Sequence, residues 1–261
     1  MAGRVPIALT IAGSDPSGGA GIQADLKTFH QFGVYGEAVI ATVTVQNTTR
    51  VEQVESLSRQ LVVSQIRAVL EDMPPAAAKT GALGSEANVH AVAELAREFA
   101  FPLVVDPVLM STHGTPLLTE DALRDELLPL ATLITPNLHE AAALSGLEVR
   151  DVATMRRAAE RIFGVGAKAV LVKGGHLPDA AVDVLLFDGQ WFEFSADRIN
   201  TRHTHGTGCA YSAAITAGLA LGWDLPEAVR RAKQWITDAI RTSPGLGSGD
   251  GPVNYFAEAP P

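Results

Sequence analysis

The sequence contains very little cysteine, no excess of basic residues and no long hydrophobic run. Its one cysteine, Cys209, cannot form a disulfide within the chain, so nothing requires an oxidising compartment and we expect a cytoplasmic protein. The 20 Lys and Arg are outnumbered by 29 Asp and Glu, which gives a formal net charge of -9. Nucleic acids and anionic membranes are bound by basic surfaces, and we therefore expect neither as a partner.

The two most hydrophobic stretches are too short, or too often interrupted, to be a secretion signal or a membrane span. Residues 5–13 continue directly into a glycine loop, and polar residues and glycines interrupt the apolar stretch after Cys209. A membrane-spanning helix needs about 20 apolar residues in a row. The chain also contains no segment that resembles a linker, so we expect residues 1–261 to form a single domain.

Short apolar segments typical of strands alternate with amphipathic segments typical of helices. We predict strands at residues 6–12, 38–46, 76–81, 102–108, 133–137 and 168–175, and a hairpin at 183–196. We predict helices at residues 22–33, 61–72, 85–99, 119–130 with Thr119 as N-cap, from 138, at 154–163, from 209 and at 225–243. This alternation predicts an α/β fold with a mostly parallel central sheet and helices on both faces.

Polar residues gather where the predicted strands end. In a parallel sheet of this kind, ligands bind beyond the carboxyl ends of the strands. The polar positions at these ends are residues 13–19, Gln46, Asn47, Lys79, Thr80, Asp106, Asn137, Glu140 and Lys173. We therefore expect them all at one edge of the sheet, around a common site.

The segment His205–Cys209 reads as a glycine-rich loop that becomes a helix. A helix N-terminus leaves backbone N–H groups unpaired, so Gly206, Thr207 and Gly208 could let a phosphoryl group approach the backbone. The alternative is a tight turn that enters a core helix. Cys209 falls in the first turn, where the helix dipole favours the thiolate, and we expect its thiol to ionise readily.

These residues together match the needs of phosphoryl transfer, which uses donors on the phosphates, a divalent cation and a group near the acceptor hydroxyl. Asp106 and Glu140 are candidates to hold Mg²⁺, partly through waters. Lys173 is a candidate to reach the phosphates. Simpler roles remain open at this point: a turn cap for Asp106, a first-turn helix acid for Glu140 and a solvated lysine for Lys173.

The order and spacing of several motifs carry a resemblance to a known family. They are LTIAGSDPSGGAGIQADLKTF, VQNT, KTG, VVDPV, TPN followed by Glu140, VLVKGGH and THGTGC. From about Ala8 to Val253 the chain resembles the hydroxymethylpyrimidine/phosphomethylpyrimidine kinases of thiamin biosynthesis, in the ribokinase-like superfamily. The resemblance implies a three-layer α/β sandwich, ATP and Mg²⁺ as cofactors, and two successive phosphorylations of 4-amino-5-hydroxymethyl-2-methylpyrimidine. It also implies a homodimer.

The resemblance also implies roles for particular residues. It implies that the pyrimidine site is formed by Gly13, Asp25, Gln46, Val108 and Cys209. It implies that ATP is bound by Asn137, Lys173, Gly206 and Gly208, with Mg²⁺ on Asp106 and Glu140. It implies that catalysis depends on Lys173, Gly206, Thr207, Gly208 and Cys209. Without the resemblance, Asp25 would be interpreted as a surface acid of its helix.

Two positions depart from the family pattern. Ala82 stands where the family usually has Met after KTG, which enlarges the expected pocket, and His203 stands where Asn is usual. Two alternative functions stay open. One is a pyridoxal kinase of the type that carries cysteine at position 209, and the other is a pyrimidine- or nucleotide-binding protein without turnover.

Overall fold

The computed structural model describes residues 5–110, 120–175, 177 and 181–260. In this part of the chain, one sheet of nine strands has the order β3-β2-β1-β4-β5-β6-β7-β8-β9. The strands are β1 (Ile7–Ser14), β2 (Tyr35–Gln46), β3 (Val51–Ser56), β4 (Ala77–Thr80), β5 (Leu103–Val105), β6 (Leu133–Ile134), β7 (Ala169–Val172), β8 (Ala181–Phe187) and β9 (Gln190–Ala196). The strands from β2 to β7 in this order are parallel, while β3 at one edge and β8 and β9 at the other are antiparallel to their neighbours.

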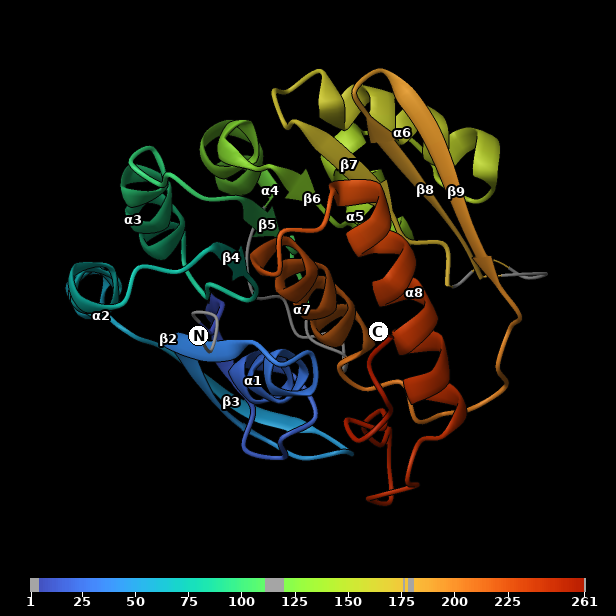
Figure 1. The fold of residues 1–261 in the computed structure, drawn as a ribbon, viewed down its shortest axis with the longest axis horizontal. Helices are drawn as coiled ribbons and strands as arrows, with labels where there is room; N and C mark the ends of the chain where they lie inside the picture. The colour runs from blue at the N-terminus through green and yellow to red at the C-terminus, as the bar shows by residue number, and fades with distance from the viewer. Residues whose placement is uncertain (1–4, 111–119, 176, 178–180, 261) are drawn as a thin grey trace.

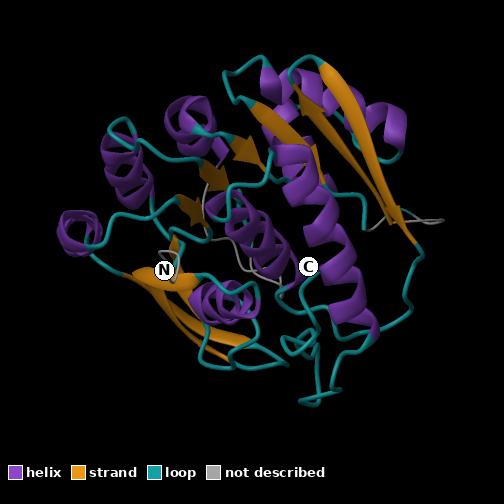
Figure 2. Cartoon of the chain, in the orientation of Figure 1, coloured by secondary structure: helices purple, strands orange, loops and turns teal. Residues whose placement is uncertain are grey.

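Helices cover both faces of the sheet. They are α1 (Gly21–Gln31), α2 (Arg59–Asp72), α3 (Glu86–Ala96), α4 (Glu120–Ala122), α5 (Leu138–Ser145), α6 (Val152–Phe163), α7 (Thr207–Ala220) and α8 (Leu225–Arg241). Helices α1, α7 and α8 cover one face and α2, α3, α5 and α6 the other (Figure 1). The buried side chains of the first group share one hydrophobic core, and those of the second group share the other. Figure 2 shows the resulting three layers of helices, strands and helices. The predicted α/β sandwich is confirmed.

The central strands are apolar throughout because both of their faces are covered. Along β7, Val170 and Val172 pack into the core beneath α3, α5 and α6, while Ala169 and Leu171 pack into the core beneath α7 and α8. Successive side chains of a strand point to opposite faces, so a short apolar run supplies both cores at once. The middle of α7 is buried on all sides for a related reason, since this helix lies between the sheet and the helices α1 and α8.

Two segments differ from the sequence prediction. Strand β3 was not predicted, because the sequence VEQVES is rich in residues that are depleted in strands; its Glu52, Gln53 and Glu55 are exposed at the sheet edge. The helix predicted at residues 119–130 is broken into α4, a π-helical turn at Leu123–Leu127 and a 3₁₀ turn at Leu128–Leu130. A proline at position 129 lacks the N–H that a continuous α-helix would use there. The predicted N-cap Thr119 lies outside the described residues.

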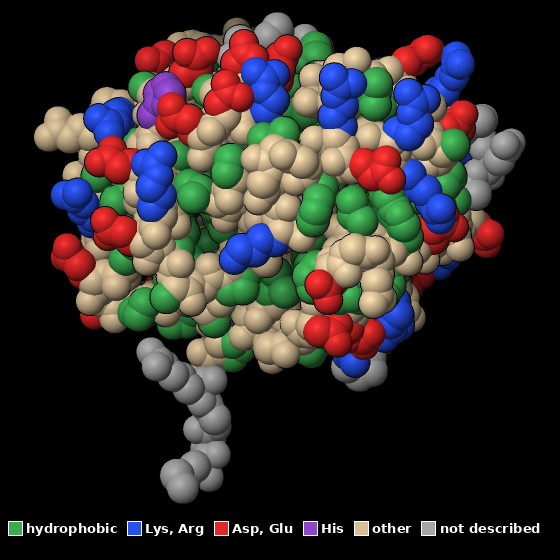
Figure 3. Space-filling model, turned by 90° about the horizontal axis from the view of Figure 1, so that it is seen from above, with side chains coloured by type: hydrophobic (Ala, Val, Ile, Leu, Met, Phe, Trp, Pro, Cys, Tyr) green, Lys and Arg blue, Asp and Glu red, His purple; other side chains and the backbone are tan. Residues whose placement is uncertain are grey.

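The hairpin prediction is confirmed by the antiparallel pairing of β8 and β9. Asp188 and Gly189 both have positive φ, 51° and 69°, as a two-residue turn between twisted strands requires. Among the described residues, no helix is both long and apolar enough to span a bilayer. On the face seen in Figure 3, acidic and basic side chains are interspersed.

Candidate active site

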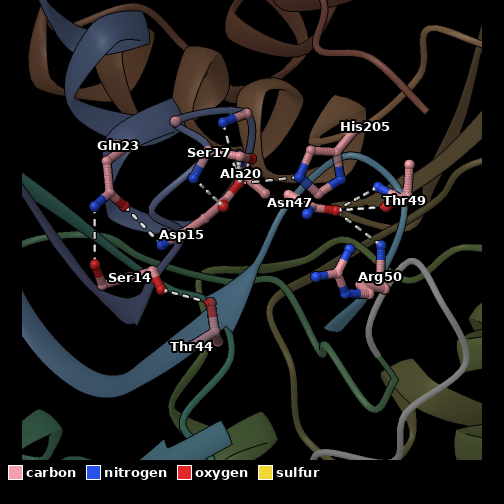
Figure 4. Close-up of polar contacts among 12 residues, drawn as sticks. Ser14, Asp15, Ser17, Ala20, Gln23, Thr44, Asn47, Thr49, Arg50 and His205 are labelled. Carbon is pink, nitrogen blue, oxygen red and sulfur yellow. Dashed lines mark hydrogen bonds and ion pairs between the residues drawn. The ribbon is translucent and has the colours of Figure 1, made fainter. Parts of the chain in front are cut away.

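The loop at residues 15–20, here named the Asp15 loop, follows β1 and is closed around one carboxylate. Asp15 accepts N–H groups of Ser17, Gly19 and Ala20 at 2.8, 3.1 and 2.8 Å. The Nε2 atom of His205, which points at Asp15 from the residues just before α7, lies 2.9 Å from its Oδ2 (Figure 4). Burial alone would raise the pKa of Asp15, but these hydrogen bonds hold it well below its usual value. The loop is therefore tied to α7 by an ionised aspartate.

The start of α7 meets the Asp15 loop backbone to backbone. Gly206 has φ of 77°, and a Cβ added to it would lie 1.7 Å from the carbonyl oxygen of Gly19. The same oxygen accepts the hydroxyl of Tyr255 at 2.7 Å, so the C-terminal segment joins this contact. We expected Gly206 to be glycine so that a phosphoryl group could approach. The close approach of the Asp15 loop is a further reason for glycine at this position.

Asp25 of α1 is fully buried, so its interpretation as a surface acid is wrong. Its Oδ1 lies 2.7 Å from Nζ of Lys79, and its Oδ2 accepts the hydroxyl of Thr10 at 2.6 Å. Lys79 is also fully buried, and it lies within β4 rather than after it. The Lys79 Nζ further donates to the carbonyl oxygen of Cys209 at 3.4 Å. The sequence placed Lys79 among the polar residues around the common site but gave it no chemical role; the available signal was a lysine inside an apolar strand.

The Cys209 thiol is not readily ionised, which corrects the expectation from its helix position. Burial raises its pKa to about 11, and the carboxylates of Asp25 and Asp106 act in the same direction. Lys79 and the N–H of Gly21 lower the pKa but do not compensate for the loss of water. Near neutral pH, the side chain is therefore a neutral thiol in the protein without ligands.

Asp106, directly after β5, is the centre of a second buried cluster. Its Oδ1 lies 2.9 Å from Nζ of Lys173 and accepts the hydroxyl of Thr135 at 3.1 Å; its Oδ2 lies 3.2 Å from the hydroxyl of Ser212. Burial raises the pKa of Asp106, but Lys173 and Lys79 lower it further, so the net direction is down. Asp106 is thus an ionised carboxylate, and Lys173, 12% exposed, is not a freely solvated lysine.

Glu140 and Asn137 form a capping box at the start of α5. The Asn137 side chain accepts the N–H of Glu140 at 2.9 Å, and Glu140 accepts the N–H of Asn137 at 2.8 Å. Glu140 is therefore a first-turn helix acid. Burial raises the pKa of Glu140 to about 7. Asp106 also raises this pKa and Lys173 lowers it, so Glu140 is electrostatically linked to the Asp106 cluster.

Gly208 joins this cluster to the N-terminus of α7. A Cβ at Gly208 would lie 3.4 Å from Nζ of Lys173 and 3.8 Å from Oδ2 of Asp106, so bare backbone faces both charges. Phosphate oxygens fit such a place beside a lysine and a helix N-terminus. The carboxylates of Asp106 and Glu140 are hard oxygen donors that suit Mg²⁺. Among the described residues, no three His, Cys, Asp or Glu are close enough to hold a metal ion, so further ligands would be waters and phosphates.

The remaining residues of the expected pyrimidine site lie on neighbouring loops and strand ends. Gln46 is the last residue of β2, and its side chain helps to lower the pKa of Asp15. Val108 is half-buried and donates its N–H to the carbonyl oxygen of Asp106 at 2.9 Å. A Cβ at Gly13 would lie 2.4 Å from the Thr42 hydroxyl and 3.8 Å from Cβ of Ala82, so Ala82 lies beside Gly13.

His203 does not point outward. A Cβ at Gly251 would lie 2.4 Å from its Nδ1, so the ring packs on the loop near residue 251. Within the part of the chain that the structure describes, this buried nitrogen has no hydrogen-bond partner. The roles of Asp15 and His205 were missed from the sequence, where these residues stand 190 positions apart. No local pattern links such distant residues.

Known proteins share both the sequence and this fold. The phosphomethylpyrimidine kinase family matches residues 15–254. The hydroxymethylpyrimidine/phosphomethylpyrimidine kinase of Rhizobium meliloti strain 1021 is 50% identical over 257 residues, which cover 96% of this chain and 97% of the relative.

Two solved structures are similar over almost their whole length. The phosphomethylpyrimidine kinase of Clostridium difficile 630 is 44% identical with a TM-score of 0.80, and covers 90% of this chain and 99% of its own. The pyridoxal kinase of Bacillus subtilis, solved as an ADP complex, is 39% identical with a TM-score of 0.90, and covers 97% and 98%. The chain belongs to the phosphomethylpyrimidine kinase family.

Proposed function

We propose that this protein is an ATP-dependent kinase of thiamin biosynthesis. It phosphorylates 4-amino-5-hydroxymethyl-2-methylpyrimidine and then the resulting monophosphate to the diphosphate. The observation that carries this proposal is the meeting of two buried clusters at the N-terminus of α7. Lys79, which pairs with Asp25, contacts the first turn at the carbonyl oxygen of Cys209, and Lys173 and Asp106 face Gly208 one residue earlier. An acceptor and a phosphoryl donor held at these clusters would meet at the same helix end.

The cluster of Asp106 and Lys173 is proposed to bind the phosphates of ATP. Lys173 supplies a positive charge, and the N–H groups of Gly206 and Gly208 supply donors for phosphate oxygens, while the N–H of Thr207 donates to the carbonyl oxygen of Thr204 at 3.2 Å. Asn137, at the start of α5, is proposed as a further contact to the nucleotide. ADP is bound by the Bacillus subtilis pyridoxal kinase, which supports a nucleotide site in this fold.

Asp106 and Glu140 are proposed to hold Mg²⁺, which would neutralise negative charge on the phosphates. In the protein without ligands, Lys173 partly satisfies Asp106, and burial keeps the pKa of Glu140 at about 7. A divalent cation would favour the ionised form of Glu140. The residues of this chain therefore hold two carboxylates and one ammonium in a largely buried site.

The pyrimidine is proposed to bind among Gly13, Asp25, Gln46, Val108 and Cys209. A carboxylate has about four lone-pair sites, so Asp25 can accept a further donor, such as an exocyclic amine, beside Thr10 and Lys79. Gln46 offers both a donor and an acceptor to ring nitrogens. Thr207 precedes Gly208 in the first turn of α7, and its N–H and hydroxyl both donate to the carbonyl oxygen of Thr204, at 3.2 and 2.7 Å; we propose that it contributes to transfer by fixing this turn.

Pyridoxal is a second candidate acceptor, favoured by one observation. The small side chain of Ala82 lies beside Gly13. A larger residue at position 82 would fill more of this side of the proposed pyrimidine site. The activity named for the Bacillus subtilis relative agrees with this candidate.

A substrate panel with Mg·ATP tests the proposal. Hydroxymethylpyrimidine, its monophosphate, pyridoxal and ribose are offered separately, and products are identified by mass spectrometry. We expect both pyrimidines to be phosphorylated with the highest kcat/KM. Turnover of pyridoxal alone would replace the proposal with the second candidate. Binding of the pyrimidine without transfer to any acceptor would identify a non-catalytic binding protein.

We further propose that residues 1–261 form one kinase domain and that the enzyme acts as a homodimer in the cytoplasm. One continuous sheet through all the described strands supports the first of these statements. The homodimer rests on the family resemblance, and the cytoplasmic location rests on the single cysteine, which leaves nothing that requires an oxidising compartment.

A further inference from the structure

Lys79 is a charged residue in a place where the fold alone does not need one. Its side chain and that of its partner Asp25 are both fully buried, in the middle of a four-residue strand that is otherwise apolar apart from Thr80. Removing two charges from water is costly, and a buried ion pair is therefore weak evidence of a stabilising role. An apolar side chain of similar length would fill the same space in β4. The position of the ammonium thus calls for another explanation.

The ammonium of Lys79 connects two elements that carry the proposed pyrimidine site. It lies 2.7 Å from Oδ1 of Asp25 on α1 and 3.4 Å from the carbonyl oxygen of Cys209 on α7. The other carboxylate oxygen of Asp25 is fixed by the hydroxyl of Thr10 at 2.6 Å. The Cys209 carbonyl also accepts from Ser212 at 3.0 Å. Lys79 therefore fixes both the orientation of the Asp25 carboxylate and the first turn of α7.

Lys79 also supplies positive charge to the surroundings of Cys209. The titratable groups that interact electrostatically with this thiol lie on several of the elements around it. They are Asp25 on α1, Lys79 on β4, Asp106 after β5, Lys173 after β7 and Tyr255 near the C-terminus. Lys79 offsets the two carboxylates, so its removal would leave the thiol facing more negative charge. The ammonium of Lys79 already contacts Asp25 and the carbonyl oxygen of Cys209, so its action is placed in these two residues and not in a contact with a substrate.

We propose that Lys79 is a positioning residue of the acceptor site, which holds the Asp25 carboxylate and the first turn of α7 together and provides the positive charge that faces Cys209. This inference deepens the proposed function, and it rests on that function for the statement that the site binds a pyrimidine. The contacts and charges themselves do not depend on which acceptor is used.

The single cysteine makes a direct test possible, because iodoacetamide alkylation reports on Cys209 alone. The rate is measured against pH for the intact protein and for Lys79→Met. Alkylation requires the thiolate, so a rise of one unit in the thiol pKa lowers the rate at a fixed pH by about tenfold. At a fixed pH, we expect Lys79→Met to be alkylated several-fold to about tenfold more slowly than the unaltered protein. We also expect its curve of rate against pH to move to higher pH.

Lys79→Met leaves a buried aspartate without its partner and can fail to fold. The double variant Lys79→Met/Asp25→Asn removes both charges and leaves no unpaired aspartate; we expect a smaller slowing than in Lys79→Met, because Asp25 acts on the thiol in the opposite direction to Lys79. Asp25→Asn alone is expected to speed alkylation. Lys233→Met is the matched control, because Lys233 is a buried lysine that pairs with Asp183 at 2.8 Å on α8 and β8. We expect it to leave the alkylation profile unchanged.

A merely structural role for Lys79 predicts the opposite sign. Loosening of the core would expose the thiol, so Lys79→Met would be alkylated faster, and either this result or an unchanged profile would overturn the proposal. Where pyrimidine turnover is measurable, we expect the double variant to raise KM for the pyrimidine more than KM for ATP. If the protein phosphorylates no pyrimidine, the proposed function fails while the alkylation test still decides the role of Lys79.

Discussion

At the scale of single residues, the neutral thiol of Cys209 changes the chemistry expected at the acceptor. A thiol with a pKa near 11 is protonated at neutral pH, so it is a poor base for the hydroxyl of the first acceptor. The second acceptor is a phosphate monoester, which is already anionic. A neutral side chain at position 209 avoids repulsion of that anion, while a carboxylate there would add to the negative charges of Asp25 and Asp106.

We therefore predict that Cys209→Asp impairs phosphorylation of the monophosphate far more than that of the free alcohol. Two like charges about 4 Å apart cost roughly 4 kcal/mol at an effective dielectric constant near 20, an upper bound for the selective loss. Cys209→Ala serves as the control, and we expect it to lower kcat/KM for both acceptors by similar factors. The measurement is kcat/KM for each acceptor in each variant. Equal losses in Cys209→Asp would show that charge at this position does not distinguish the two acceptors.

A second prediction concerns Glu140, which the structure makes both a helix cap and a neighbour of the Asp106 cluster. Glutamine at the same position can still accept the N–H of Asn137, so Glu140→Gln keeps the capping box but loses the charge. We expect kcat or the apparent Mg²⁺ affinity to fall about ten- to hundredfold, with little change in thermal stability. Activity is titrated with Mg²⁺ in both proteins.

The matched control is Glu227→Gln, because Glu227 is also a first-turn acid, on α8, and is paired with Arg230 and Arg231 instead. This variant should keep the Mg²⁺ dependence of the unaltered protein. Near-full activity of Glu140→Gln at limiting Mg²⁺ would leave Glu140 as a helix cap alone.

The residues that sequence reasoning found and missed differ in a physical way. Asp106, Glu140 and Lys173 stand where strands end or helices begin, so a local pattern locates them. The roles of Lys79 and His205 depend on partners far along the chain. Their burial is known only once the strands and helices are packed together. The ionisation of Cys209 was predicted with the wrong sign because the helix position is a local feature and the loss of water is not.

At the scale of secondary-structure elements, the packing of α2 on β2 buries one acidic side chain, that of Glu37. Glu37 on β2 is 6% exposed, and in the described part of the chain neither of its carboxylate oxygens has a hydrogen-bond partner. Burial raises its pKa to about 7, and Asp72 at the end of α2 acts in the same direction. The packing of α2 on β2 therefore favours the protonated acid.

This packing makes stability depend on pH with a definite sign. In the unfolded chain Glu37 releases its proton near its ordinary pKa of 4.5, but in the folded chain it releases it near 7. The contribution of Glu37 is therefore fully present below pH 4.5 and is lost as the pH rises through 7. We predict that Glu37→Gln raises the free energy of unfolding by about 1–2 kcal/mol above pH 7 and changes it little near pH 4.5.

Thermal unfolding at the two pH values provides the measurement, and a change of 1 kcal/mol corresponds to a shift of about 2–4 °C in Tm for a protein of this size. Glu55→Gln, a substitution of an exposed glutamate on β3, is the control and should have little effect at either pH. An equal shift of Tm at both pH values in Glu37→Gln would contradict the prediction.

The elements themselves were largely predictable. The alternation of apolar strands and amphipathic helices depends on nearest neighbours in sequence, and α1, α3, α6 and α8 appear where the pattern places them. The pattern fails where tertiary pairing overrides it. Strand β3 forms because β2 offers it a free edge, and the turns at residues 123–130 follow a proline and local packing instead of a continuous helical period.

At the scale of the whole molecule, the fold class follows from composition and order, while the exact joining of distant segments does not. Parallel strands with helical connections leave few arrangements, because each connection is right-handed and the ligand edge is fixed by strand direction. The meeting of the Asp15 loop, the start of α7 and the C-terminal segment is a different matter. It brings together Gly19, Gly206 and Tyr255, and no period in the sequence relates them.

This meeting of three segments also sets an order in time during synthesis on the ribosome. The Asp15 loop is synthesised before the rest of the sheet that follows β1, but the hydroxyl that binds the Gly19 carbonyl belongs to a residue 236 positions later. At 5–20 residues per second, the interval is roughly 10–50 s. Throughout that interval the growing chain carries the Asp15 loop without its last support. The loop beside the proposed pyrimidine site is therefore completed only after Tyr255 has been made, so a chain that stops before this residue would retain most of the sheet without a finished site.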